Sequence, residues 1–309
     1  MKFAFVFPGQ GSQTVGMLDA WASDQAAQQI VAQANEALGE DIGALIANGP
    51  AEDLNLTTNT QPAMLTASLA MLAAWRAAGG PEASVMAGHS LGEYAALTAA
   101  GSLSLADAVR LVRIRADAMQ AAVPVGTGAM AAILGLEDDA VIAACQQASQ
   151  SEVVEAVNFN APAQVVIAGH KAAVERAMDN AKAAGAKRAV LLPVSAPFHS
   201  SLLKPAAAIL AQALADVQIN VPKVPVIHNV DVQMHQEPAA IRQALVDQAW
   251  HPVRWVQTIE AMAAQGVTHV VECGPGKVLS GLVKRISPGL TGMSVTDPAS
   301  MKAALDALN

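Results

Sequence analysis

The arrangement with the clearest potential for chemistry is a serine between two glycines, in the segment Gly88-His89-Ser90-Leu91-Gly92. This G-x-S-x-G pattern follows a short apolar run and precedes a helix-like segment, which is the context of a nucleophile elbow. Glycines flank the serine because the turn is tight, and the helix that begins there offers free N–H groups to an oxyanion. Ser90 is therefore predicted to be a nucleophile, with an ordinary strand-to-helix turn as the alternative.

A serine nucleophile needs a base, and the chain has seven histidines. His89 adjoins Ser90, but neighbouring side chains on such a turn point apart. His199 follows a predicted strand and lies in a loop at a predicted domain junction, where catalytic groups tend to concentrate. Its position favours His199 as the general base, with a solvated surface histidine as the alternative.

A cation on the buried side of a predicted helix is the third candidate for chemistry. In the helix expected at 104–121, a rotation of about 100° per residue places Arg110 and Arg113 on the solvated face. The same rotation places Arg115 on the opposite side, among apolar residues. A lone buried cation is costly unless it is paired, so Arg115 forms a structural ion pair or receives a ligand carboxylate.

Alternating strand and helix patterns must position these residues, and they are typical of an α/β fold with a mainly parallel sheet. The short apolar runs that precede turns predict strands, and the longer periodic segments predict helices. Strands are expected at 3–7, 84–88, 225–228 and 269–273, and helices at 63–77, 91–100, 104–121 and 206–215.

The middle of the chain has the different order β-α-β-β-α-β, which is the ferredoxin-like pattern. Its strands are expected at 129–135, 153–159, 165–168 and 189–194, and its helices at 138–150 and 171–184. We therefore predict a large α/β-hydrolase-like catalytic domain from residues 1–125 and 197–309. Residues 126–196 are predicted to form an inserted ferredoxin-like subdomain.

The composition excludes several classes of protein. The chain has 309 residues, 53% of them hydrophobic and 14% charged, which excludes intrinsic disorder and allows a large core. A net charge of −8 argues against a nucleic-acid binder. Only 3% of the residues are aromatic, so recognition is expected to rest on chemistry other than stacking.

Membrane insertion and secretion are not expected. The uncharged stretch 54–75 has only about 12 apolar residues after its polar start, too few to span a bilayer. The apolar run at the N-terminus is too short for a signal peptide. Cys145 and Cys273 form neither a disulfide framework nor a metal motif, and no histidine pair has zinc-ligand spacing. We expect a cytoplasmic protein without a metal.

Several short motifs together resemble malonyl-CoA:acyl carrier protein transacylase of bacterial type II fatty-acid synthesis. Each motif is weak alone, but their order and spacing over nearly the whole chain are specific. They are Phe7-Pro8-Gly9-Gln10-Gly11-Ser12-Gln13, Gly88-His89-Ser90-Leu91-Gly92-Glu93-Tyr94, Gly126-Thr127-Gly128-Ala129-Met130, Val157-Asn158-Phe159-Asn160, Val166-Ile167-Ala168-Gly169-His170, Asn229-Val230-Asp231-Val232 and Gly274-Pro275-Gly276-Lys277-Val278-Leu279.

The resemblance implies a role for each matching residue. Ser90 is similar to the nucleophile that becomes a malonyl ester, and His199 to the general base. Arg115 is similar to the arginine that pairs with the malonyl carboxylate. The N–H groups of Gln10 and Leu91 match the oxyanion hole. Gln248 is similar to the residue whose carbonyl orients the histidine. Phe198 is bulky where some members of that family have a small residue, so it should disfavour methylmalonyl groups.

The resemblance also implies partners. The expected substrate is malonyl-CoA and the expected acceptor is the phosphopantetheine thiol of acyl carrier protein, with no cofactor, no nucleic acid and no membrane, and with a monomeric enzyme. Because that carrier is also acidic, docking requires a local basic patch, and Lys187-Arg188 and Lys284-Arg285 are the candidates. The alternatives are a serine esterase or thioesterase, a related malonyl transferase serving malonate decarboxylase or a polyketide synthase, and a non-catalytic partner.

Overall fold

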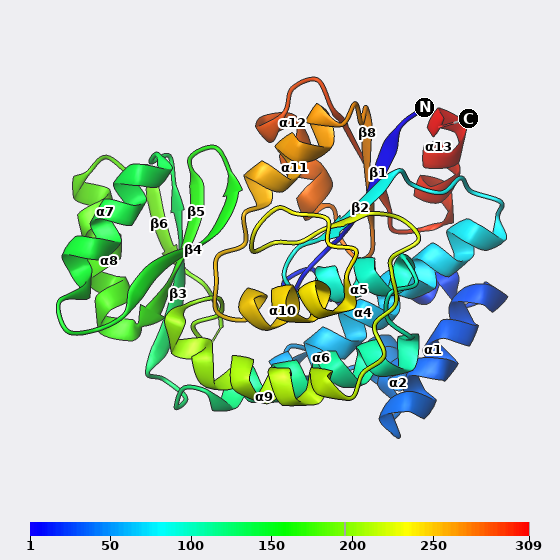
Figure 1. Ribbon diagram of the computed structural model, residues 1–309, viewed down its shortest axis with the longest axis horizontal. Helices are drawn as coiled ribbons and strands as arrows, with labels where there is room; N and C mark the ends of the chain where they lie inside the picture. The colour runs from blue at the N-terminus through cyan, green and yellow to red at the C-terminus, as the bar shows by residue number, and fades with distance from the viewer. Residues whose placement is uncertain (195, 309) are drawn as a thin grey trace.

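The computed structural model describes residues 1–194 and 196–308, so Ser195 and Asn309 lie outside it. Its larger sheet has five parallel strands in the order β7-β2-β1-β8-β9 (Figure 1). These strands are β1 (Phe3–Phe7), β2 (Val85–Gly88), β7 (Val226–Ile227), β8 (His269–Cys273) and β9 (Thr291–Val295). The predicted α/β class with a parallel sheet is confirmed.

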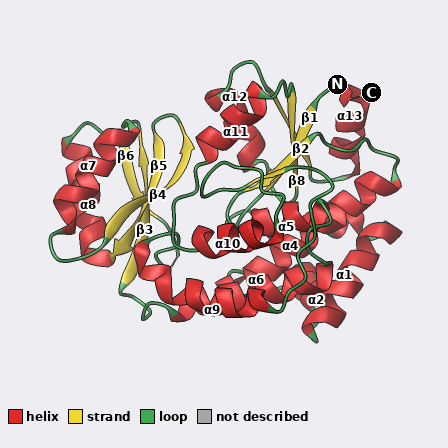
Figure 2. Cartoon of the chain, in the orientation of Figure 1, coloured by secondary structure: helices red, strands yellow, loops and turns green. Residues whose placement is uncertain are grey.

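Helices cover both faces of this sheet, as the red ribbons on either side of the yellow strands indicate (Figure 2). The helices before the smaller sheet are α1 (Gln25–Leu38), α2 (Ile42–Asn48), α3 (Ala51–Leu54), α4 (Thr57–Ala77), α5 (Gly92–Ala99) and α6 (Leu105–Ala121), with the 3-10 turn η1 (Asp19–Trp21). Those after it are η2 (Ser201–Leu203), α9 (Lys204–Ala215), α10 (Pro238–Gln248), α11 (Trp255–Ala264), α12 (Val278–Ile286) and α13 (Pro298–Leu308). In the described part of the chain, no helix is long and apolar enough to span a bilayer.

Strand β1 explains how both faces acquire a core. All five of its residues are buried, and their side chains alternate between the faces. Phe3, Phe5 and Phe7 belong to the cluster formed with α1, α4, α5, α6 and α9. Ala4 and Val6 belong to the opposite cluster, which is formed with α11 and α12. A strand buried on both sides is typical of a parallel sheet.

Helix α4 begins at Thr57, six residues before the predicted start at Ala63. The prediction stopped there because Pro62 and the polar residues before it are typical of a loop. In the fold Thr57, Thr60 and Gln61 are buried, and the Thr60 hydroxyl donates to the Leu54 carbonyl. Tertiary packing has overridden the local preference.

The smaller sheet has the antiparallel strand order β4-β5-β3-β6. Its elements are β3 (Gly128–Leu134), α7 (Asp138–Ser149), β4 (Val154–Ala161), β5 (Gln164–His170), α8 (Lys171–Ala183) and β6 (Arg188–Leu191). Helices α7 and α8 pack together on one face over their own apolar cluster. We call residues 128–191 the small unit. Its element order supports the proposal of an inserted ferredoxin-like subdomain at 126–196.

The open face of the small sheet turns toward the large sheet (Figure 1). Met130, Val157, Val166 and Ala168 form an apolar cluster there, and Phe198 packs against it. Strand β4 is joined to the segment before α11, since the Phe159 N–H donates to the Val253 carbonyl at 3.0 Å. The candidate catalytic residues lie between the two sheets.

Candidate active site

Ser90 lies at a strained turn between β2 and α5. Its backbone is left-handed, with φ 52°, which is unfavourable for a residue with a side chain. A Cβ on Gly88 would lie 1.8 Å from the carbonyl carbon of Gly92, and one on Gly92 would lie 2.2 Å from the Phe7 oxygen. Only glycines fit these two positions, so the turn requires the G-x-S-x-G pattern.

Asn229 holds this turn from a neighbouring strand. Its Oδ1 accepts from the Ser90 N–H at 2.8 Å, and its Nδ2 donates to the Gly88 carbonyl at 2.7 Å. The residue follows β7, which pairs with β2, so the sheet order delivers it to the elbow. Asn229 belongs to the motif Asn229-Val230-Asp231-Val232, but the sequence alone indicates no role for it.

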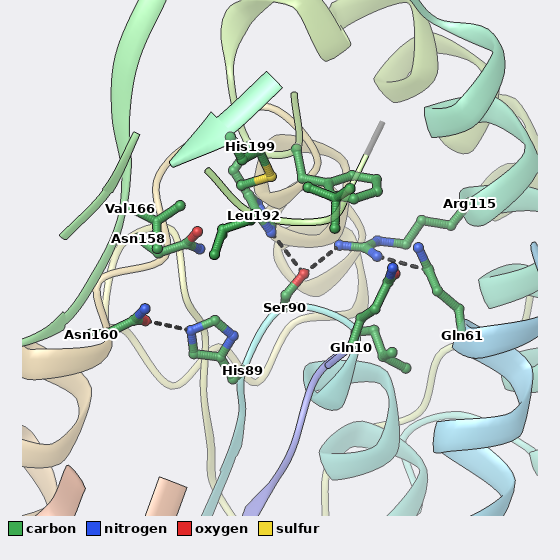
Figure 3. A pocket seen from close by; sticks show the side chains of 14 residues that line it. Gln10, Gln61, His89, Ser90, Arg115, Asn158, Asn160, Val166, Leu192 and His199 are labelled. Atoms are coloured by element: carbon green, nitrogen blue, oxygen red, sulfur yellow. Dashed lines mark hydrogen bonds between the residues drawn. The ribbon is translucent and has the colours of Figure 1, made fainter. Parts of the chain in front are cut away.

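His199 lies next to Ser90 although the two are 109 residues apart, with 2.7 Å between the Ser90 Oγ and the histidine Nε2 (Figure 3). The Nδ1 is 2.8 Å from the Gln248 carbonyl. A carbonyl only accepts, so the proton of the neutral ring belongs on Nδ1, and Nε2 is free to accept from the serine hydroxyl. Like Ser90, His199 has a left-handed backbone, with φ 64°.

The environment of His199 keeps the ring neutral. Its side chain is buried, and burial is the largest cause that lowers its pKa, followed by the positive charge of Arg115. The hydrogen bond to the Gln248 carbonyl opposes this shift without reversing it, and the pKa falls to about 3. A neutral imidazole is the form that accepts a proton.

Arg115 projects from α6 into the same site and is 2% exposed. Its Nη1 donates to the Gln61 Oε1 at 2.8 Å, and its Nη2 donates to the Gln248 Oε1 at 2.9 Å and to the Ser90 Oγ at 3.0 Å. Among the described residues, no carboxylate forms a salt bridge with it. The described residues therefore do not form the structural ion pair that the sequence left open for Arg115.

A buried polar network behind Ser90 fixes the partners of Arg115. Glu93 accepts from the His228 Nδ1 at 2.7 Å, the Asn229 N–H at 2.9 Å and the Gln248 Nε2 at 3.0 Å. Because the carboxylate binds the amide NH₂ of Gln248, the amide oxygen must face Arg115. Gln248 therefore contributes both its side chain and its carbonyl. The sequence indicated only the carbonyl, because the side-chain partners are far apart in the chain.

Gln10 and Leu91, the expected oxyanion-hole residues, line the same cavity as Ser90. Strand β1 pairs with β2 so that Phe7 opposes Gly88, and this register brings the loop after β1 to the elbow. The Gln10 side chain donates to the Thr57 hydroxyl at 3.1 Å. The N–H groups of residues 92–94 each donate to the carbonyl three residues earlier. Among the described residues, the Leu91 N–H makes no backbone hydrogen bond of this kind.

A cavity of about 200 Å³ opens onto these groups (Figure 3). His89 is on the wall away from Arg115, where its Nε2 lies 2.8 Å from the Asn160 Oδ1, so it points away from Ser90 as the sequence indicated. Burial lowers the pKa of His89. The lining residues come from the loops after β1 and β2, from α4 and α6, from strands β3, β4 and β5 of the small unit, and from the segment after β6. They include Gln10, Gln61, His89, Ser90, Leu91, Arg115, Met130, Asn158, Asn160, Val166, Leu192, Val194, Phe198 and His199.

No cluster of three or more His, Cys, Asp and Glu residues suited to a metal occurs among the described residues. The site offers a serine, a neutral histidine, a buried guanidinium and the backbone N–H of Leu91, which has no backbone acceptor among the described residues. This set can form and discharge an acyl-serine, and it can bind an acyl group that carries its own negative charge.

Comparison with known proteins is consistent with this chemistry. The acyl transferase domain family model matches residues 4–302. The chain is 57% identical over 306 residues to malonyl CoA-acyl carrier protein transacylase of Escherichia coli (strain K12), covering 99% of each chain. It is 46% identical to the protein of that name from Bacillus subtilis (strain 168), covering 99% of this chain and 97% of the relative.

Solved structures agree with the sequence relatives. The crystal structure of acyl-carrier-protein S-malonyltransferase from Burkholderia pseudomallei 1710b has a TM-score of 0.98 and 62% identity, covering 99% of this chain and all of that one. A malonyl-transacylase solved in complex with its type II PKS acyl-carrier protein has a TM-score of 0.98 and 51% identity, with 99% and 100% coverage. The chain therefore belongs to the acyl transferase domain family, among the malonyl CoA-acyl carrier protein transacylases.

Proposed function

We propose that this protein transfers the malonyl group from malonyl-CoA to the phosphopantetheine thiol of acyl carrier protein, through a malonyl ester on Ser90. The observation that carries the proposal is the position of Arg115, whose buried guanidinium lies 3.0 Å from the Ser90 hydroxyl. A buried cation needs a compensating anion. An acyl group that ends in a carboxylate supplies it, whereas an acetyl group does not.

In the first half-reaction, the Ser90 Oγ attacks the thioester carbonyl and its proton passes to the His199 Nε2, 2.7 Å away. The Gln248 carbonyl stabilises the imidazolium through Nδ1–H. The tetrahedral oxyanion accepts from the N–H groups of Gln10 and Leu91, and one such donor is typically worth about 3–4 kcal/mol. The C–S bond then breaks, and coenzyme A takes the proton from His199 and leaves as a thiol.

In the second half-reaction, the carrier thiol gives its proton to His199 and attacks the malonyl ester. The ester C–O bond breaks, and the proton returns from His199 to the Ser90 oxygen. Between the two steps, Arg115 holds the malonyl carboxylate at one end of the acyl group. A fixed acyl group in a narrow cavity leaves water poorly placed to reach the ester carbonyl.

Malonyl-CoA is the substrate in this scheme and coenzyme A is a product, and the proposed steps use only residues of the chain. The names of the relatives support malonyl-CoA as donor and acyl carrier protein as acceptor. Two buried free cysteines, Cys145 and Cys273, support a reducing compartment, and we propose the cytoplasm.

Two exposed basic pairs are proposed as docking sites for the acidic carrier. Lys187 and Arg188 stand at the start of β6, and the chain continues from this strand to Leu192 and Val194 in the cavity wall. Lys284 and Arg285 lie in the last turn of α12, and Arg285 donates to the Gln164 side chain of the small unit. The first pair belongs to the small unit, and the second contacts it through Gln164.

The direct test is intact-protein mass spectrometry after rapid mixing with malonyl-CoA. A single malonyl adduct is expected on the wild type and none on Ser90→Ala. Addition of acyl carrier protein bearing phosphopantetheine should remove the adduct and leave malonyl on the carrier. No adduct under rapid quench would refute the proposal.

The same experiment separates the alternatives. An esterase or thioesterase would lose the adduct to water at the same rate with or without the carrier. A transferase serving another carrier would form the adduct and keep it in the presence of fatty-acid carrier. Comparison of p-nitrophenyl acetate hydrolysis with malonyl transfer adds an independent check on the hydrolase alternative.

A further inference from the structure

The loop that carries His199 needs an anchor of its own. This residue adopts a left-handed backbone, and its side chain is held at Nδ1 by the Gln248 carbonyl. The loop runs from the small unit to η2, and several of its hydrogen bonds are internal, such as that from the Ser200 Oγ to the Pro197 carbonyl. Internal bonds shape a loop, but they do not fix its place relative to Ser90.

Glu155 provides an anchor from the other side of the site. It lies on β4 of the small unit, and its carboxylate accepts two hydrogen bonds from Ser201, two residues after His199. The Ser201 N–H donates to Oε2 at 2.7 Å, and the Ser201 Oγ donates to Oε1 at 2.8 Å. Hydrogen bonds to an ionised carboxylate are about twice as strong as neutral ones, and two of them fix direction as well as distance.

Among the described residues, these two are the hydrogen bonds through which a side chain on a strand of the small unit contacts residues 199–203. They are also close to the chemistry, since the ring of His199 must keep its Nε2 within 2.7 Å of the Ser90 Oγ. A displacement of the loop by a fraction of an ångström weakens that contact, and proton transfer depends steeply on such distances.

We propose that Glu155 is a positioning residue: through Ser201 it holds the His199 loop against the small unit and keeps the imidazole in register with Ser90. Movement of the small unit is thereby coupled to the position of the base. The inference rests on the proposed Ser90–His199 pair and adds to it a residue in the other sheet.

Truncation of Glu155 should leave the protein folded. The side chain is only partly buried and borders a cavity of about 390 Å³, whose lining also includes His199 and Ser201. Removal of the carboxylate therefore enlarges an existing space instead of creating a sealed one. The substitution also leaves no unpaired buried charge, because Ser201, the hydrogen-bond partner of Glu155, is neutral.

The experiment measures the rate at which a fluorophosphonate labels Ser90, a reaction that needs the serine and its base but neither malonyl-CoA nor a carrier. The Ser90 oxygen bonds to phosphorus, fluoride leaves, and His199 takes the proton. Glu155→Ala is expected to slow labelling about tenfold. Malonyl-adduct formation should slow by the same factor at saturating malonyl-CoA, with KM changed by less than about twofold because Arg115 is untouched.

Glu155→Gln is the conservative variant. Its Oε1 can accept from the Ser201 N–H while its Nε2 donates to the Ser201 Oγ, so both contacts survive and labelling should stay near the wild-type rate. Ser201→Ala removes one contact and keeps the N–H, so labelling should slow by about twofold to threefold. This milder variant tests the proposal if Glu155→Ala fails to fold.

Glu152→Ala is the matched control. Glu152 is another carboxylate of the small unit, and it pairs with Arg176 at 2.7 Å without contact to the His199 loop. Its loss should leave the labelling rate unchanged. Wild-type labelling in Glu155→Ala, or an equal loss in Glu152→Ala, would overturn the inference. A wild type that is not labelled at Ser90 would overturn the Ser90–His199 pair, and with it both the proposed function and this inference.

Discussion

Replacement of Arg115 by alanine is the sharpest test of substrate selection. The guanidinium is buried, forms no salt bridge with a described carboxylate, and has both Nη atoms directed at the cavity side of the site. Malonyl and acetyl thioesters differ at the carboxylate that Arg115 is proposed to bind. Arg115→Ala should therefore reduce malonyl transfer far more than acetyl transfer.

The size of the effect follows from the contacts. A hydrogen bond to a charged group contributes about 1.5–3 kcal/mol, so a bidentate carboxylate would gain about 3–6 kcal/mol. Binding must also displace the bonds from Nη2 to Ser90 and Gln248, which favours the lower half of that range. At about 1.4 kcal/mol for each factor of ten, the malonyl preference should fall about 10²–10³-fold.

The assay compares kcat/KM for malonyl-CoA and acetyl-CoA in the wild type and the variant. Arg115 also donates to the Ser90 Oγ, but loss of that contact affects both substrates and cancels in the ratio. Arg115→Lys keeps the charge without the planar fork, and its ratio should lie between the other two. Thermal unfolding and fluorophosphonate labelling of Ser90 report whether each variant is folded and retains a reactive serine.

An unchanged ratio in a folded, labelled variant would refute the role of Arg115 as a carboxylate receptor. A fall in malonyl and acetyl transfer by the same factor would assign the residue to activation of Ser90 alone. A gain in relative acetyl transfer of at least about 100-fold would support the proposal.

Two further predictions follow from the same geometry. Because burial and the charge of Arg115 lower the pKa of His199 to about 3, the base stays neutral as the pH falls through 6.5, and labelling of Ser90 should stay constant from pH 8 to about pH 5. In Arg115→Ala the nearby positive charge is gone, so the acid limb should move to higher pH, and a limb that does not move would contradict this electrostatic account. Phe198 lines the cavity and packs against Met130 and Val166, so Phe198→Ser should raise the ratio of methylmalonyl to malonyl transfer by at least about tenfold, measured with both thioesters in competition.

Local sequence patterns were sufficient for the elements that carry the site. The predicted strand at 3–7 agrees with β1, and the helix at 104–121 agrees with α6 and its cap at Ser104. The sequence of a strand buried on both faces is a continuous apolar run. The sequence of a half-buried helix has apolar residues that recur with a period of 3.6 residues. The same period placed Arg115 on the buried face. The strand β9 and the helices α1, α2, α3, α10, α11, α12 and α13 were not predicted from the sequence.

The contacts around the site residues could not be predicted from local sequence patterns. Glu93 with His228, Gln61 with Arg115, and Glu155 with Ser201 join residues between 46 and 135 positions apart. Nothing in local spacing determines which distant side chains meet, because that depends on the order of strands in the sheets.

The sequence by itself determined the reactive turn, the buried cation and, through the resemblance, the family. Only the tertiary structure decided that Asn229 braces the turn, that Gln248 uses its side chain as well as its carbonyl, and that Glu155 reaches the His199 loop. The physical reason is the order β7-β2-β1-β8-β9, which sets side by side the ends of strands that are remote in the chain, and the packing of the small unit across them.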